Sequence, residues 1–186
     1  MLESTAMGVA LKKLTWEDLK DLPESHGRTE LVDGELVVSP TPALQHQLIC
    51  DRLAARLGGF VATRGGLMFG RPVHIIFDEH VHYEPDLCYF APHRALDLDA
   101  PYVKAAPDLI VEVISESNRS HDTVVKFRDY ERYGVREYWL VDPREAHIRV
   151  FVLEGAAYRL VGVFGRGEPV SSRVLEGLAF EAGEIL

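Results

Sequence analysis

The chain has 186 residues, of which 47% are hydrophobic and 26% are charged, and its formal net charge is −9. This length and composition are typical of one globular domain over residues 1–186. The negative charge argues against a protein that coats nucleic acid, and the sequence lacks both a membrane span and a signal peptide, so we expect a soluble cytoplasmic protein.

The first elements expected along the chain are a short helix and a hairpin. Residues 15–18, TWED, have the pattern of a capping box, which predicts a helix from Thr15 toward Leu22. Residues 29–38, TELVDGELVV, predict two strands joined at Asp33-Gly34, because Asp-Gly between alternating apolar residues favours a tight turn.

A longer helix and three strands are expected next. Leucines at helical spacing predict an amphipathic helix over residues 44–57, which Gly58-Gly59 should end. Two strands follow, at about 67–77 and 81–90. Residues 106–115, APDLIVEVIS, predict a third and largely buried strand.

The C-terminal half predicts one more helix and a set of hairpin strands. The helix should be capped by Ser120 or Asp122 and should end at Gly134. The strands expected after it cover residues 137–141, 147–153 and 157–163, followed by a weakly patterned tail. Cys50 and Cys88 lack a metal-binding spacing, and we expect them to be reduced core thiols without a function.

The strand APDLIVEVIS carries two acids, although burial of an unpaired carboxylate costs several kcal/mol. If this strand pairs with the preceding one, Glu112 and Asp86 converge, and two carboxylates suit Mg²⁺. Lys126 starts the next helix and can reach the same pocket. Taken singly, each acid is better explained by solvation at a strand end or by pairing with an arginine, and it is the ordered combination that favours a functional site.

This order of residues resembles the PD-(D/E)XK nuclease superfamily and, more closely, its restriction-endonuclease-like Uma-type family. The resemblance extends from about residue 28 to about residue 153, through RTELVDGELVVSPTPALQHQ, YEPDLCYF and APDLIVEVISESNRSHDTVVKFRDYERYGVREYWLVDP. It implies a mixed α/β fold with a restriction-endonuclease-like core, in which helices flank a mixed sheet, preceded by the N-terminal helix and hairpin.

The resemblance also implies a site. The pattern places a lysine at position 114, where this chain has isoleucine, so the lysine is expected on the following helix. Mg²⁺, or Mn²⁺ as a substitute, is expected to bind two carboxylates and the carbonyl of Val113. The catalytic residues implied are Asp86, Glu112, Lys126 and Glu30, with Lys126 orienting the attacking hydroxide or stabilising the transition state.

Two further residues are peripheral candidates. His46 matches a family position and has either a phosphate contact or a packing role, whereas Asp108 is either a metal ligand or the partner of an arginine. A different metal centre would use His80 and His82 with Glu84, which alternate along one strand face.

The leading functional hypothesis is a Mg²⁺-dependent endonuclease whose partner is DNA and which acts as a homodimer, the most frequent closed symmetry. The net charge does not exclude this activity, because acids around a divalent cation contribute charge that the cation cancels. The alternative is a catalytically inactive interaction domain of the same fold, associated with mobile DNA.

Overall fold

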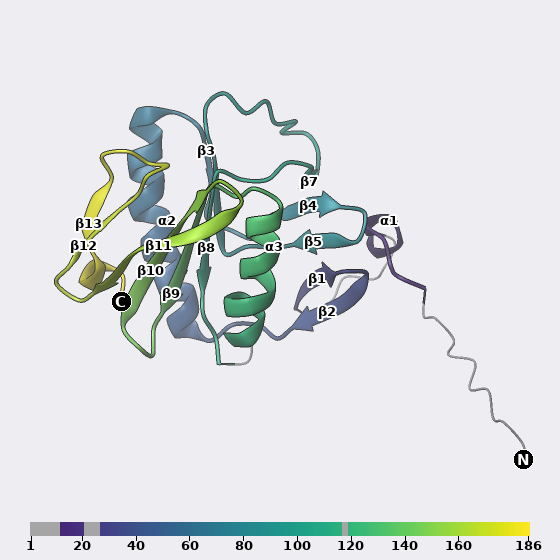
Figure 1. Ribbon diagram of the computed structural model, residues 1–186, viewed down its shortest axis with the longest axis horizontal. Helices are drawn as coiled ribbons and strands as arrows, with labels where there is room; N and C mark the ends of the chain where they lie inside the picture. The colour runs from purple at the N-terminus through teal and green to yellow at the C-terminus, as the bar shows by residue number, and fades with distance from the viewer. Residues whose placement is uncertain (1–11, 21–26, 117–118) are drawn as a thin grey trace, which may run out of the picture.

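The computed structural model describes residues 12–20, 27–116 and 119–186 (Figure 1). Its helical elements are α1 (Trp16–Leu19), α2 (Leu44–Arg64), the π-helix η1 (His121–Lys126), α3 (Phe127–Arg132) and the 3₁₀-helix η2 (Ala182–Glu184). Its strands are β1 (Arg28–Val32), β2 (Glu35–Ser39), β3 (Leu67–Phe69), β4 (His74–Asp78), β5 (Val81–Tyr83), β6 (Leu87–Phe90), β7 (Tyr102–Val103), β8 (Leu109–Val113), β9 (Glu137–Asp142), β10 (His147–Glu154), β11 (Ala157–Gly165), β12 (Pro169–Ser171) and β13 (Ala179–Glu181).

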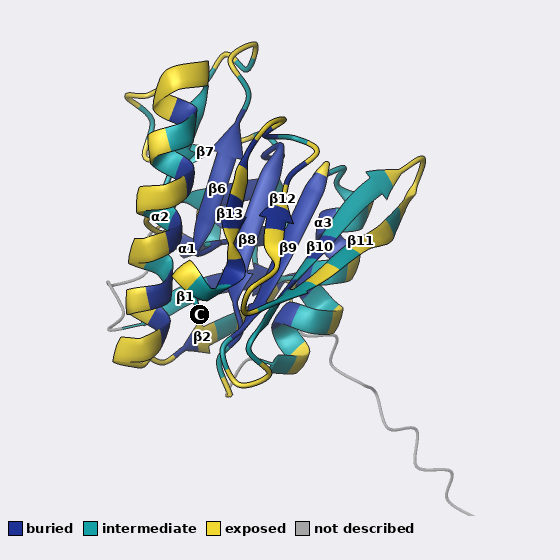
Figure 2. Cartoon of the chain, turned by 90° about the vertical axis from the view of Figure 1, so that its left-hand side faces the viewer, coloured by how far each residue is buried: buried dark blue, intermediate teal, exposed yellow. Residues whose placement is uncertain are grey.

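The strands form two larger sheets and one small one. The central sheet has the order β11-β10-β9-β8-β6-β3, with β8 and β9 parallel and the other pairs antiparallel. The second sheet has the order β2-β1-β5-β4-β7, and β12 pairs with β13. Helices α2 and α3 lie on opposite faces of the central sheet (Figures 1 and 2). The predicted mixed α/β fold with flanking helices is confirmed.

Alternation along β8 divides the core into two apolar clusters. Leu109, Val111 and Val113 pack with the buried face of α2, and the small β12–β13 sheet covers the same cluster. Ile110 and Ile114 face the other way and pack with Tyr130 of α3. Figure 2 shows the central strands buried between these layers. Glu112 therefore points toward the α3 layer, because it shares a face with these two isoleucines.

Each of the two long strands predicted between residues 67 and 90 is broken in two, and the halves belong to different sheets. The first break contains Gly70, Arg71 and Pro72, and the second contains Glu84 and Pro85. Proline has no N–H to donate to a sheet, and it restricts the residue before it, so strands end there. This correction matters for the site, because Asp86 is the last residue of the second break.

Helix α2 does not end at Gly58-Gly59 but continues to Arg64. Two internal glycines cost about 1 kcal/mol each relative to alanine. The extra turn buries Val61, which is 4% exposed, and burial of a valine contributes about 1.5 to 3 kcal/mol. The helix ends instead at Gly65, whose φ of 86° is open to glycine.

The remaining local predictions have mixed outcomes. The capping box of Thr15 and Asp18 is present, although α1 ends at Leu19 and the predicted end near Leu22 lies outside the described residues. The Asp33-Gly34 turn joins β1 and β2 as predicted, with φ values of 48° and 81°. The helix expected to be capped by Ser120 or Asp122 begins as a π-helix, and Ser120 makes no capping hydrogen bond through its side chain within the described residues.

The tail beyond residue 165, for which no structure was predicted, forms β12, β13 and η2. Two arginines of α2 contact this tail. The Arg52 guanidinium donates a hydrogen bond to the carbonyl of Ile185, and Arg56 forms an ion pair with Glu184. Within the described ranges, no helix is both long enough and apolar enough to cross a membrane.

Candidate active site

Asp86 and Glu112 meet at one end of the central sheet. The antiparallel β6–β8 register places Leu87 opposite Val111. Asp86, directly before Leu87, is therefore next to Glu112, directly after Val111. The backbone N–H of Val113 donates to Asp86 Oδ2 over 2.8 Å. The two carboxylates are 3% and 1% exposed, so both are removed from water. The convergence expected from the sequence is therefore present.

Asp86 is held by two further groups. Arg28 Nη2 lies 2.6 Å from Asp86 Oδ1, and His46 Nε2 lies 3.1 Å from Asp86 Oδ2. Burial alone raises the pKa of Asp86, but the His46 hydrogen bond and the Arg28 charge outweigh it and hold that pKa well below its usual range. Asp86 is consequently a permanent carboxylate at neutral pH.

Glu112 has the opposite electrostatic character. Its Oε1 accepts hydrogen bonds from Lys126 Nζ at 2.9 Å and from the Tyr130 hydroxyl at 2.8 Å. Burial raises the pKa of Glu112 to about 8, because desolvation outweighs the attraction of Lys126. Arg28 Nη1 is 3.8 Å from Glu112 Oε2, so one guanidinium stands beside both acids.

Glu30 and Lys126 form the buried back of the site. Lys126 Nζ is 2.9 Å from Glu30 Oε1 and 3.5 Å from Asp122 Oδ1, in addition to its contact with Glu112. Burial lowers the pKa of Lys126, but these three carboxylates more than reverse the effect, so the ammonium stays charged. His121 Nε2 lies 2.9 Å from Glu30 Oε2 and completes the group.

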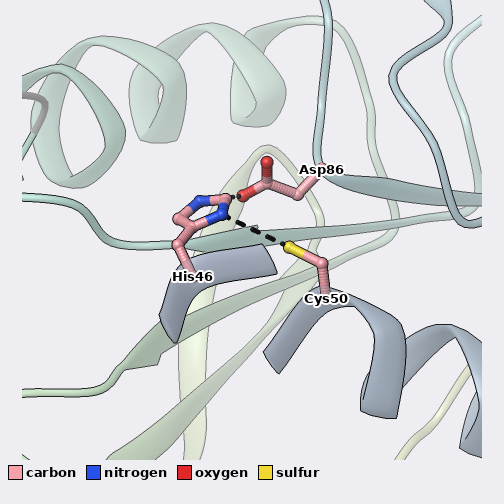
Figure 3. Close-up of side chains that lie close together, drawn as sticks. All are labelled: His46, Cys50 and Asp86. Atoms are coloured by element: carbon pink, nitrogen blue, oxygen red, sulfur yellow. Dashed lines mark hydrogen bonds and ion pairs between the residues drawn. The ribbon is translucent and has the colours of Figure 1, made fainter. Parts of the chain in front are cut away.

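His46 belongs to the site and is not remote from it. It lies in the first turn of α2, and its ring sits between Asp86 and Cys50 (Figure 3). The Cys50 sulfur is 3.6 Å from His46 Nδ1. Burial raises the pKa of the Cys50 thiol, so it stays protonated. Sequence reasoning gave no role to this cysteine, which lies one helical turn after His46.

Asp108 contacts a different set of residues from those around Asp86 and Glu112. Its carboxylate accepts from Arg94 Nε at 3.1 Å and Nη2 at 3.0 Å, from the N–H of Ala91 at 2.9 Å, and from Arg136 at 3.3 Å. Of the two roles left open for Asp108, the structure supports the arginine partner, because two arginines contact its carboxylate and it does not line the cavity over Asp86 and Glu112.

A cavity of about 520 Å³ opens over the acids and is lined in part by Asp86, Glu112 and Val113. Arg28 also lines this cavity, whereas Lys126 lies behind Glu112 and is only 1% exposed. Sequence reasoning missed Arg28. Its position two residues before Glu30 on one strand is a usable signal, because such residues share a face.

The net charge of the site favours binding of a divalent cation. Among the residues that the structure describes, four carboxylates converge here, from Glu30, Asp86, Glu112 and Asp122, and Arg28 and Lys126 are the permanent cations that contact them. Full ionisation therefore leaves two negative charges in excess when the histidines are neutral. Carboxylate and carbonyl oxygens are the ligands that Mg²⁺ prefers, so this donor set fits the metal.

The histidines of the second sheet differ from expectation. His80 lies in the β4–β5 turn, where its Nδ1 is 2.8 Å from the carbonyl oxygen of Leu14. His74 takes its place beside His82, with His74 Nδ1 2.9 Å from His82 Nε2 and 3.6 Å from Glu84 Oε1. Of the alternative group of His80, His82 and Glu84, the structure therefore brings His82 and Glu84 together but not His80.

Comparison with known proteins identifies the fold and the family of this chain. A crystal structure described as "a putative nuclease belonging to DUF820" from Anabaena variabilis ATCC 29413 superposes with a TM-score of 0.79. The two chains are 20% identical, and the match covers 92% of this chain and 97% of the other, which shows a shared fold. No protein of curated function matches the sequence. Residues 16–183 match the model of the Uma2 family, described as "Putative restriction endonuclease", and the chain belongs to this family.

Proposed function

We propose that the protein is a Mg²⁺-dependent endonuclease that hydrolyses phosphodiester bonds of DNA. The observation that carries this proposal is the convergence of Asp86, Glu112 and a buried lysine beneath one open cavity. Family membership supports it. Asp86, Glu112 and the carbonyl of Val113 would hold the metal, which when bound lowers the pKa of a water and neutralises phosphate charge.

The two cations of the site have different proposed roles. Arg28 lines the cavity, so its guanidinium is the cation that can contact a phosphate and stabilise the charge that develops in the transition state. Lys126 is enclosed by carboxylates, and we assign it a positioning role, in which it orients Glu112 and lowers the pKa of that carboxyl group. Glu30 and Asp122 in turn hold Lys126 in place.

His46 is proposed to position Asp86. Its Nε2 contacts Asp86 Oδ2, the oxygen that also accepts the Val113 N–H, so the carboxylate is held by donors from α2 and β8 together. This leaves Asp86 Oδ1 facing Arg28. Removal of His46 should therefore disturb the orientation of the acid more than its charge.

Plasmid cleavage with Mg²⁺ tests the proposal. Glu112→Gln removes the charge of a metal ligand while it keeps the side-chain shape, and we expect it to abolish cleavage. The matched control is Glu116→Gln, which makes the same change at the rim of the same cavity, where Glu116 is exposed and pairs with Arg144. We expect the control to cleave like the wild type.

Two results would contradict the proposal. Equal cleavage by Glu112→Gln and the wild type would show that Glu112 is not a catalytic metal ligand. A wild-type protein that cleaves neither DNA nor RNA, with Mg²⁺ or with Mn²⁺, would instead favour the inactive interaction domain.

A further inference from the structure

A second group of metal-binding side chains lies on the five-stranded sheet. Strands β4 and β5 are antiparallel, with Ile76 opposite His82 and Ile75 opposite Tyr83. His74 shares a face with Ile76, and cross-strand partners project to the same side of a sheet. His74, His82 and Glu84 consequently project from one face of the hairpin.

The three side chains are close enough to share an ion. His74 Nδ1 is 2.9 Å from His82 Nε2 and 3.6 Å from Glu84 Oε1, and all three ligand atoms lie within 4.8 Å of one another. Ligands of tetrahedral zinc, at about 2.1 Å from the metal, stand about 3.4 Å apart. Changes of a few tenths of an ångström up to about 1.5 Å in the distances between the ligand atoms would therefore give the geometry of a zinc site.

The surroundings fix one ligand and leave another adjustable. His82 is 1% exposed, and the Trp16 ring packs against it and against His74 with centroid distances of 4.8 and 5.3 Å. The His74 side chain is 43% exposed, so its other ring nitrogen can face water and the ring can turn toward an ion. The group is thus both partly preformed and accessible.

We propose that His74, His82 and Glu84 form a site for a divalent transition metal of the Zn²⁺ class, separate from the carboxylate site. Two imidazoles and one carboxylate are typical ligands of zinc, cobalt or nickel, whereas Mg²⁺ prefers oxygen ligands. A water would occupy the fourth position.

This metal would stabilise the packing of β4 and β5 against β1, the strand that carries Glu30. The N–H of Thr29 donates to Glu84 Oε1 over 3.2 Å, and the N–H of Glu84 donates to Glu30 Oε1 over 3.2 Å. An ion bound to Glu84 therefore ties β4 and the end of β5 to β1. Its role is structural, because none of its three ligand residues lines the cavity over Asp86 and Glu112.

Metal binding to chelator-treated protein in excess Mg²⁺ tests this site. Zn²⁺ is titrated by calorimetry, and Co²⁺ is followed by its visible absorption. The key variant is His74→Phe, which keeps a ring against Trp16 but removes the ligand nitrogen. The matched control is His93→Phe, which makes the same change at an exposed histidine.

We expect one tight ion per chain in the wild type and in His93→Phe. In His74→Phe, affinity should fall at least about tenfold, since even the indirect partners of metal ligands contribute that much. Glu84→Gln should weaken metal binding similarly, although the glutamine side chain can still accept the hydrogen bond from the Thr29 N–H. These readouts are independent of DNA cleavage, so this proposal and the nuclease proposal can fail separately.

Three outcomes would overturn the proposal. The first is no binding of Zn²⁺ or Co²⁺ by the wild type, and the second is unchanged affinity in His74→Phe. The third is a thiolate-to-cobalt charge-transfer band that disappears in Cys50→Ser. That band would place the ion at His46, Cys50 and Asp86, whose ligand atoms also lie within 4.8 Å of one another.

Discussion

Glu112→Gln should stabilise the metal-free protein while it abolishes activity. The folded state raises the pKa of Glu112 from 4.5 to about 8. At about 1.4 kcal/mol for each tenfold change in proton affinity, full ionisation of this group costs the fold about 5 kcal/mol. A neutral amide avoids this cost but makes weaker hydrogen bonds to Lys126 and Tyr130, at a loss of about 1 kcal/mol each.

The sign of this effect depends on pH. Between about pH 4.5 and pH 8 the folded protein binds more protons at Glu112 than the unfolded chain does, so stability falls as pH rises through this window. Above pH 8 the Glu112→Gln variant should gain about 2 to 3 kcal/mol in unfolding free energy. The gain should disappear toward pH 5, where the carboxyl group is protonated in the folded state and costs little.

Urea denaturation with a chelator present, at pH 5, 7 and 8.5, measures this difference. Asp86→Asn is the matched control, because the pKa of Asp86 is lowered by the fold and its ionised form is stabilising. That variant should lose stability at all three pH values. A Glu112→Gln variant that is destabilised at pH 8.5, or equally stabilised at every pH, would refute the reasoning.

Three further predictions concern Lys126, Gly58 of α2 and Gly70, which lies between β3 and β4. Lys126→Met should shift the acid limb of the pH–rate profile to higher pH, since Lys126 lowers the pKa of Glu112; a uniform drop in rate without a shift would instead indicate direct contact with the reacting phosphate. Gly58→Ala should raise the unfolding free energy by about 0.5 to 1 kcal/mol, because an added Cβ meets nothing within 4 Å. Gly70→Ala should destabilise in the same denaturation assay, because its Cβ would lie 2.6 Å from that of Ala54, and equal effects at both positions would contradict this account.

Predictions that rest on local chemistry agree best with the structure. The capping box before α1 and the Asp33-Gly34 turn depend on residues within four positions of one another, and both are present. The errors occur where tertiary packing decides. Gly58-Gly59 signals a helix end, but burial of Val61 continues the helix, and apolar patterning across Pro72 and Pro85 conceals the change of sheet.

The candidate site shows the same division. The strand pattern was sufficient to bring Asp86 and Glu112 together, because strand pairing and alternation are regular. Arg28 lies 58 residues from Asp86 in sequence, and His121 lies 91 residues from Glu30, so no local pattern links them. The burial of Lys126 likewise follows from how α3 packs on β8.

The π-helical turn before α3 makes the site sensitive to the length of the chain. A π turn accommodates one residue more than an α turn. If η1 became α-helical with all of its residues kept, the added rotation would be about 100°, so His121 would leave Glu30 while Lys126 stayed on Glu112. Deletion of Thr123 would compensate for that conversion, because it removes the additional residue and leaves His121 and Lys126 one turn apart. The additional residue of the π turn is therefore matched to the helix geometry that lets both side chains reach the charge network.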